Sequence, residues 1–332
     1  MSLIGRRILL DTNLWSYLGD DGGGSDLYKA VHDRGCQIVL APSVLLEVLR
    51  SPHEASRQRI VEAMMDSNGN RLASEAELCA GEFVRVVKRS RPEWIRPMAD
   101  TARVATYHLF WTKKVWRAAR ERPGDLHSWL TLNDTPAVHM LSSQRENRGS
   151  ILKDRFSFEV DDLWASPPSD APEHYMGGWD GSRVHAWRVE LRDYYWTFMT
   201  LHYSYSLGGH FGQTERDWVG SYVDISRATS DRADFTKLWI EEIASFDVKR
   251  DWLRWAVRWV QSTMKVTDGN PRDEQHSAYL VDADLFLSAD KRFVAILQEI
   301  RSRASFSFAD VKLVKADHSA SIVDSIIDAI DV

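Results

Sequence analysis

The stretch Ile8-Leu9-Leu10-Asp11-Thr12-Asn13-Leu14-Trp15 decides the fold. An apolar run leads into an acid and two small polar residues, and a helical pattern follows. This order predicts a buried strand over residues 7–10 that delivers the Asp11 carboxylate at its end, and a helix over 14–18. Ligands of open α/β sheets bind outside the carboxyl ends of the strands, so we expect Asp11 at such a binding edge.

The same strand-then-helix order recurs along the chain. Residues 37–41 form a second apolar strand, and Pro42 and Ser43 then open a helix over 44–50, where the missing N–H of proline costs nothing. The pattern returns near the C-terminus with strands over 285–288 and 311–314 and helices over 292–301 and 319–330. Repeated β–α units favour a parallel sheet, here an α/β fold built from both ends of the chain.

The middle of the chain has a different composition. Of 14 tryptophans, all but Trp15 fall between Trp94 and Trp259. Long aromatic-rich helical periods cover residues 100–122, 183–207 and 237–265. We therefore predict an all-helical, Trp-rich insertion over 86–265, between an N-terminal part of the α/β domain (1–85) and a C-terminal part (266–332).

Composition narrows the class of protein. The 332 residues carry a net charge of −6 and are 44% apolar, which is ordinary for a globular protein. Two cysteines, Cys36 and Cys79, cannot form a disulfide framework, so we expect a reducing, cytoplasmic setting. The N-terminus lacks the signals of a secretory peptide, and no apolar run approaches the roughly 20 residues of a membrane span.

Four acids stand where an α/β sheet would place a site. Asp11 ends the first strand, Glu47 lies inside an otherwise apolar helix, Asp273 opens a helix over 273–280, and Asp290 follows the strand over 285–288. Each has an ordinary structural explanation as a helix cap, a first-turn acid or a solvent-facing side chain. No single structural explanation accounts for all four acids together, because like charges at one edge repel unless something positive lies among them.

All-oxygen ligation indicates a hard cation, Mg²⁺ or Mn²⁺, rather than zinc. Two such ions about 4 Å apart can activate a water molecule and clamp a phosphodiester. The acidic set therefore favours metal-dependent phosphodiester hydrolysis.

These motifs resemble the PIN-domain nuclease family. The family pattern is matched by Asp11-Thr12-Asn13 after the first strand and by Ser43-Val44-Leu45-Leu46-Glu47 in the helix after the second. It is also matched by Asp273 opening a helix and by Ser288-Ala289-Asp290-Lys291-Arg292-Phe293, in which Asp290 lies 17 positions after Asp273. The resemblance covers residues 5–85 and 268–332. The insertion of about 180 residues departs from the family pattern.

The resemblance implies a metal-dependent endoribonuclease that cleaves single-stranded or structured RNA with an activated water and without a covalent enzyme intermediate. Asp11, Glu47, Asp273 and Asp290 would be catalytic metal ligands. Asn13 and Ser288 would orient those ligands or contact phosphate, and Asp284 is an extra acid to which we assign either that role or a structural one. A toxin with a protein antitoxin as partner and a stand-alone enzyme are both compatible with the resemblance.

A basic stretch in the middle offers a second contact with nucleic acid. In Trp111-Thr112-Lys113-Lys114-Val115-Trp116-Arg117-Ala118-Ala119-Arg120, aromatic residues alternate with Lys113, Lys114, Arg117 and Arg120. Such a stretch could stack bases and bind phosphates, but the pattern favours a helix with a buried tryptophan face and a solvated basic face.

Other classes of function fit less well. Asn13 replaces the second acid of the Asp-x-Asp motif of haloacid dehalogenase phosphatases, Gly22-Gly23-Gly24 lacks the Gly-Lys-Ser/Thr of a P-loop, and the histidines show no zinc spacing with the cysteines. Two alternatives remain: a catalytically inactive PIN-like scaffold that binds nucleic acid or protein, and a structure-specific DNA nuclease.

Overall fold

The computed structural model describes residues 5–132, 163–165, 177–200, 213–262, 270–315 and 321–331. The chain divides into two compact units, each described by itself below. Unit 1 comprises residues 1–75, 108–138 and 267–332, and unit 2 comprises 76–107 and 139–266.

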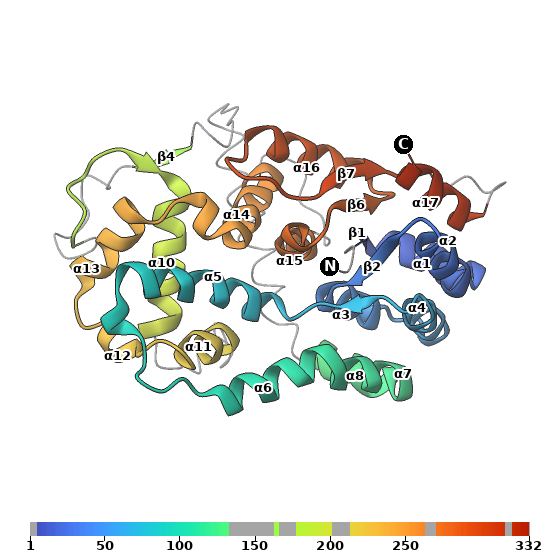
Figure 1. Cartoon of the computed structure of the whole chain (residues 1–332), viewed down its shortest axis with the longest axis horizontal. Helices are drawn as coiled ribbons and strands as arrows, with labels where there is room; N and C mark the ends of the chain where they lie inside the picture. The colour runs from blue at the N-terminus through green and yellow to red at the C-terminus, as the bar shows by residue number, and fades with distance from the viewer. Residues whose placement is uncertain are drawn as a thin grey trace. The chain divides into compact units, whose positions relative to one another are not determined.

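A five-stranded sheet forms the centre of unit 1 (Figure 1). Its strands are β1 (Arg6–Leu10), β2 (Cys36–Leu40), β3 (Asn70–Arg71), β6 (Leu285–Ser288) and β7 (Asp310–Leu313). They lie in the order β3-β2-β1-β6-β7, and every pairing is parallel. The predicted parallel sheet made from both ends of the chain is confirmed, since β1 pairs directly with β6. The edge strand β3 was not predicted, and its two residues give no periodic signal.

Helices flank this sheet. They are α1 (Thr12–Asp21), α2 (Gly24–His32), α3 (Pro42–Arg50), α4 (Glu54–Asp66), α15 (Asn270–Ser277), η7 (Ala278–Asp282), α16 (Lys291–Arg303) and α17 (Ile322–Asp331). Ile8, Leu9 and Leu10 are at most 1% exposed, which shows that both faces of β1 are covered. Continuous apolar runs rather than alternation are what strands covered on both faces require.

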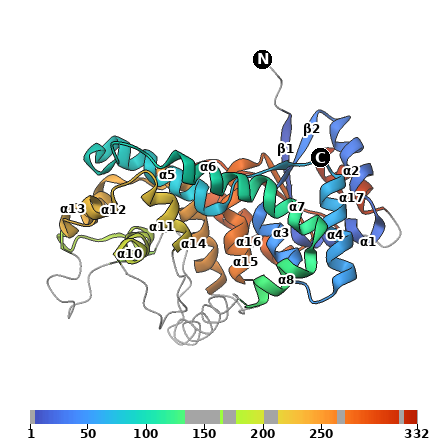
Figure 2. The same cartoon turned by 90° about the horizontal axis from the view of Figure 1, so that it is seen from below.

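Part of the predicted insertion belongs to unit 1. The π-helical turn η2 (Phe110–Lys114), α7 (Val115–Glu121) and α8 (Pro123–Leu132) continue from α6 (Thr101–Leu109), and α7 and α8 pack on α4 and α3 (Figure 2). The His127 ring Nδ1 lies 2.9 Å from the Leu49 carbonyl oxygen, and the Arg71 guanidinium lies over the buried Trp116 ring. The unit therefore gains a segment that sequence composition assigned elsewhere, because tryptophan content does not distinguish one core from another.

Unit 2 is mainly helical. Its elements are α5 (Glu75–Ser90), η1 (Pro92–Trp94), β4 (Trp164–Ala165), β5 (Val184–His185), α10 (Ala186–Thr200), α11 (Gln213–Gly220), α12 (Ile225–Ala228), α13 (Arg232–Lys237), η5 (Leu238–Glu242), η6 (Ser245–Asp247) and α14 (Lys249–Ser262), with most of α6. The antiparallel pair β4–β5 makes the expectation of an all-helical insertion wrong in this detail. Residues 201–207 and 263–265 of the predicted helices lie outside the described residues.

Aromatic side chains fill the core of unit 2. The Tyr195 ring lies 4.5 Å from the Phe83 ring and 4.8 Å from the Trp239 ring, measured between centroids. The Tyr195 hydroxyl donates to an Asp251 carboxylate oxygen at 2.8 Å, so the buried polar tip has its partner. Trp255 on α14 is 1% exposed and belongs to the same core. Across the described ranges, we find no helix that combines the length and the apolar character of a membrane span.

Candidate functional site

The carboxyl ends of β1, β2 and β6 share one edge of the sheet, because the three strands are parallel neighbours. Asp11 follows β1 directly, α3 with Glu47 begins after β2, and Ser288 is the last residue of β6. Asp273 arrives on α15, which contacts α3. We call this place the acidic edge, and define it by Asp11, Glu47, Asp273 and Asp290.

Asp11 is the N-cap of α1 and the centre of a hydrogen-bond network. Its Oδ1 accepts from the Thr12 backbone N–H at 2.7 Å, and its Oδ2 accepts from Asn13 Nδ2 at 2.8 Å and from the Ser288 hydroxyl at 2.5 Å. Burial raises the pKa of the Asp11 carboxyl, against the influence of His276 and the Ser288 hydrogen bond, which lower it. The carboxylate is thus held in one orientation by residues from both ends of the chain.

Asp290 caps the next helix. Its Oδ1 accepts from the backbone N–H groups of Arg292 and Phe293 at 2.8 and 3.0 Å. Its own N–H donates to Ser288 Oγ at 2.9 Å, and Asn13 Oδ1 accepts from the Ala289 N–H at 3.0 Å. The cap explanations for Asp11 and Asp290 are therefore correct, and Asn13 and Ser288 join the two caps.

Glu47 is bound by three side chains. Its Oε2 accepts from the Thr12 hydroxyl at 2.5 Å and lies 2.7 Å from His276 Nε2, while its Oε1 accepts from Arg272 Nη1 at 3.4 Å. Burial by itself raises the pKa of Glu47, but His276, Thr12 and Arg272 outweigh it and lower the pKa to about 2. An acid inside an apolar helix needs partners, and these residues supply them.

His276, which contacts Glu47, is buried, with 3% of its surface exposed. Its Nδ1 lies 2.7 Å from the Ser43 hydroxyl oxygen, which fixes the second ring nitrogen. Burial lowers the pKa of the imidazole, but the hydrogen bond to Glu47 and the charges of Glu47, Asp11 and Asp273 reverse that effect and raise it.

Asp273 experiences the combined charge of the acidic edge. Burial raises its pKa most, and although His276 lowers it, the charges of Asp11, Glu47 and Asp290 add to the increase and bring the pKa to about 8. Like charges favour the neutral form of a carboxyl only when they lie close to it. The structure therefore brings Asp11, Glu47 and Asp290 within electrostatic reach of Asp273.

Asp284 does not belong to this group. It precedes β6 and so lies at the opposite edge of the sheet, where its Oδ2 accepts from the Arg7 backbone N–H at 2.8 Å and lies 3.5 Å from Arg7 Nε. Of its two predicted roles, the structural one is correct. One strand length separates it from the acidic edge, because it stands before the strand and Asp290 after it.

The basic stretch shows one buried and one solvated face. Trp116 is fully buried, while Lys113, Lys114, Arg117 and Arg120 are exposed along η2 and α7. The Trp116 indole N–H donates to the Trp111 carbonyl oxygen at 2.9 Å, so this tryptophan serves the fold. The four cations remain candidates for contact with nucleic acid.

Sequence reasoning missed Arg272, His276, Thr12 and Ser43 as members of the site. A signal was present, since Arg272 and His276 flank Asp273 on one short helix and Ser43 stands one turn before Glu47. What the sequence could not supply is that these two helices meet.

Comparison with known proteins adds no relative: no family model matches the chain, and neither curated proteins nor solved structures yield a match. Within the described ranges, no three His, Cys, Asp or Glu side chains are arranged to hold a metal ion. In this conformation the carboxylates of Asp11 and Glu47 are bound by protein donors.

Proposed function

We propose that the protein is a divalent-metal-dependent nuclease that hydrolyses phosphodiester bonds of RNA. One observation carries the proposal: four acids from four separate segments stand at the carboxyl edge of a parallel sheet, and their charges help to raise the pKa of Asp273 to about 8. A group of like charges of this kind costs stability, and strongly shifted pKa values cluster at functional sites.

The residues fit a hard divalent cation by the chemistry of their donors, which are carboxylate oxygens throughout. Asp11, Asp273 and Asp290 would hold the ion, together with Glu47, whose oxygens are shared with Arg272 and His276. When bound, such an ion supplies an activated water and charge compensation at the phosphate.

The chain's own residues prepare this edge. Asn13 and Ser288 fix the Asp11 carboxylate and the start of α16, and Thr12 and His276 fix Glu47. Groups that orient ligands in this way commonly change affinity or activity by about 10–100-fold when they are removed. A nearby positive charge would lower the pKa of Asp273 from about 8 and favour its charged form.

The test uses the purified full chain and a labelled single-stranded RNA. Cleavage is expected with Mn²⁺, none with EDTA, and a loss on the order of 10²-fold or more in Asp11→Asn, because the fixed carboxylate is removed while the side-chain volume is kept. Asp20→Asn is the matched control, since Asp20 is an exposed acid at the other end of α1, paired with Arg59.

Three results contradict the proposal. Cleavage by Asp11→Asn in EDTA would show that a contaminant or another site acts. Absence of Mn²⁺ binding by calorimetry would leave the inactive scaffold, and a preference for flap DNA over RNA would change the substrate to structured DNA.

A further inference from the structure

Arg272 is a cation at the acidic edge that is only loosely engaged. It stands directly before Asp273 on α15, and its Nη1 donates to Glu47 Oε1 at 3.4 Å. That distance is near the limit of a hydrogen bond, and 35% of the Arg272 side chain is exposed. A charge-assisted bond between well-placed partners is shorter, at about 2.7–2.9 Å.

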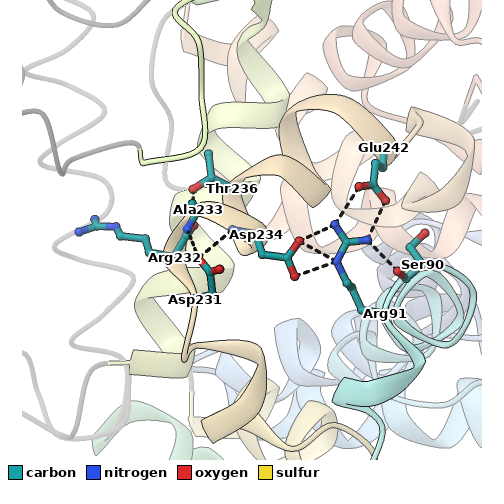
Figure 3. Close-up of polar contacts among 8 residues, drawn as sticks. All are labelled: Ser90, Arg91, Asp231, Arg232, Ala233, Asp234, Thr236 and Glu242. Atoms are coloured by element: carbon teal, nitrogen blue, oxygen red, sulfur yellow. Dashed lines mark hydrogen bonds and ion pairs between the residues drawn. The ribbon is translucent and has the colours of Figure 1, made fainter.

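Arg91 of unit 2 shows what a fully engaged arginine looks like (Figure 3). Its Nε and Nη2 donate to Asp234 at 2.7–2.9 Å, and its Nη1 and Nη2 donate to Glu242 at 3.0 and 2.8 Å. Its Nη1 also donates to the Ser90 carbonyl oxygen at 2.7 Å, and only 12% of the side chain is exposed. The side-chain donors of such an arginine are bound within the protein and stabilise its structure.

Glu47 does not depend on Arg272 for its position. The Thr12 hydroxyl and His276 Nε2 both bind Glu47 Oε2 at short distances, and His276 is buried and bound in turn to Ser43. The contact from Arg272 goes to the other oxygen and is the longest of the three. If Arg272 leaves, Glu47 keeps both short contacts to Oε2 and loses only the long one to Oε1, on a side chain that is 20% exposed.

A guanidinium carries five N–H donors in a planar fork. Among the described residues, the hydrogen bond that Arg272 makes through its side chain uses one of them. Planar forks of this kind match two oxygens of a phosphate group, and arginine does so with a geometry that lysine does not reproduce.

We propose that Arg272 binds a backbone phosphate of a single-stranded nucleic acid at the acidic edge and exchanges its long contact with Glu47 for that phosphate. The inference rests on the proposed function for the identity of the ligand, and it adds Arg272 as a residue that binds this ligand. The acids of this edge repel a polyanion, so a cation beside Asp273 gives the backbone a favourable point of contact.

The test measures binding without cleavage. The anisotropy of a labelled single-stranded oligoribonucleotide is titrated with the full chain in EDTA at several salt concentrations. Each phosphate contact to a single strand contributes about −0.7 to the slope of log affinity against log salt. Arg272→Gln should reduce the slope by that amount and weaken binding by about tenfold, equally for two unrelated sequences, because phosphate contacts carry no sequence information.

Two further variants sharpen the result. Arg272→Lys keeps the charge and should keep the slope, with weaker binding because the fork is lost. Arg34→Gln is the matched control: Arg34 is bound to Asp331 through Nε and Nη2 at the opposite edge of the sheet, so slope and affinity should stay those of the wild type.

The outcomes separate the two proposals. An unchanged slope in a folded Arg272→Gln, or an equal change in Arg34→Gln, overturns the role of Arg272 even if the wild type cleaves RNA with Mn²⁺. No measurable binding by the wild type overturns it as well. The expected loss of slope without any Mn²⁺-dependent cleavage supports Arg272 and refutes the nuclease.

Discussion

The acids at the two edges of the sheet in unit 1 differ in how they are paired with cations. At the amino edge three acids each pair with an arginine: Asp284 with Arg7, Asp331 with Arg34, and Asp310 with Arg301. At the carboxyl edge, Asp11, Glu47, Asp273 and Asp290 stand with Arg272 and His276.

The difference shows where the fold tolerates unfavourable electrostatics. Exposed one-to-one pairs contribute little to stability and need no special arrangement. A buried group with excess negative charge costs free energy and persists in natural proteins chiefly where it serves a ligand. The contrast, more than any single motif, directs attention to the carboxyl edge, and four changes test it.

The largest effect should come from adding a divalent cation that binds at the acidic edge. Saturating Mn²⁺ should raise the free energy of unfolding of unit 1 by about 2.7 kcal/mol at a hundred times the dissociation constant. Amide hydrogen exchange of β1 measures this within unit 1. Asp11→Asn should lose the effect and Asp331→Asn at the amino edge should keep it; equal protection in both would show that the ion binds elsewhere.

Removal of His276 should come next. His276→Ala removes the His276 contact of the buried Ser43 hydroxyl and leaves Glu47 Oε2 with the Thr12 hydroxyl alone. A buried polar group left unsatisfied costs about 1–3 kcal/mol. Urea denaturation should show the loss of stability, and amide hydrogen exchange should locate it in α3 and α15. A change no larger than that in Asp331→Asn would mean that the two helices do not depend on this bond.

Asp273→Asn should stabilise the protein. The carboxyl has an ordinary pKa of 3.8 and a folded-state pKa of about 8, so the folded state binds the proton more tightly and loses stability as pH rises between these values. Asparagine does not ionise, and the gain should reach about 0.5–2 kcal/mol above pH 8 and vanish below pH 4. Thermal unfolding across this range checks it; a stabilisation that grows toward low pH would contradict the sign.

The smallest effect is expected at the amino edge. Asp284→Asn removes an exposed contact with Arg7 and should cost less than about 1 kcal/mol, because the Arg7 backbone N–H can still donate to the amide oxygen. Its Mn²⁺ response should match the wild type. A loss of the Mn²⁺ response would show that Asp284 contributes to the metal site after all.

Local sequence was sufficient where the signal is local. The apolar run before Asp11 predicts β1, Asp11 itself suits a helix cap, and the apolar residues 285–287 predict β6, all as found. It was insufficient for β3, whose two residues have no period. It was also insufficient for α7 and α8, which pack on α4 and α3 of unit 1 although their tryptophans resemble those of unit 2.

By itself the sequence determined which strands form and which acids end them, because hydrophobic period and helix capping act between neighbours in the chain. Only the tertiary structure decided that His276 and Arg272 reach Glu47 across 229 and 225 positions, and that Asp284 stays away from Asp11. The physical reason is that parallel pairing of β1 with β6 fixes which strand ends share an edge, and that pairing joins segments from opposite ends of the chain.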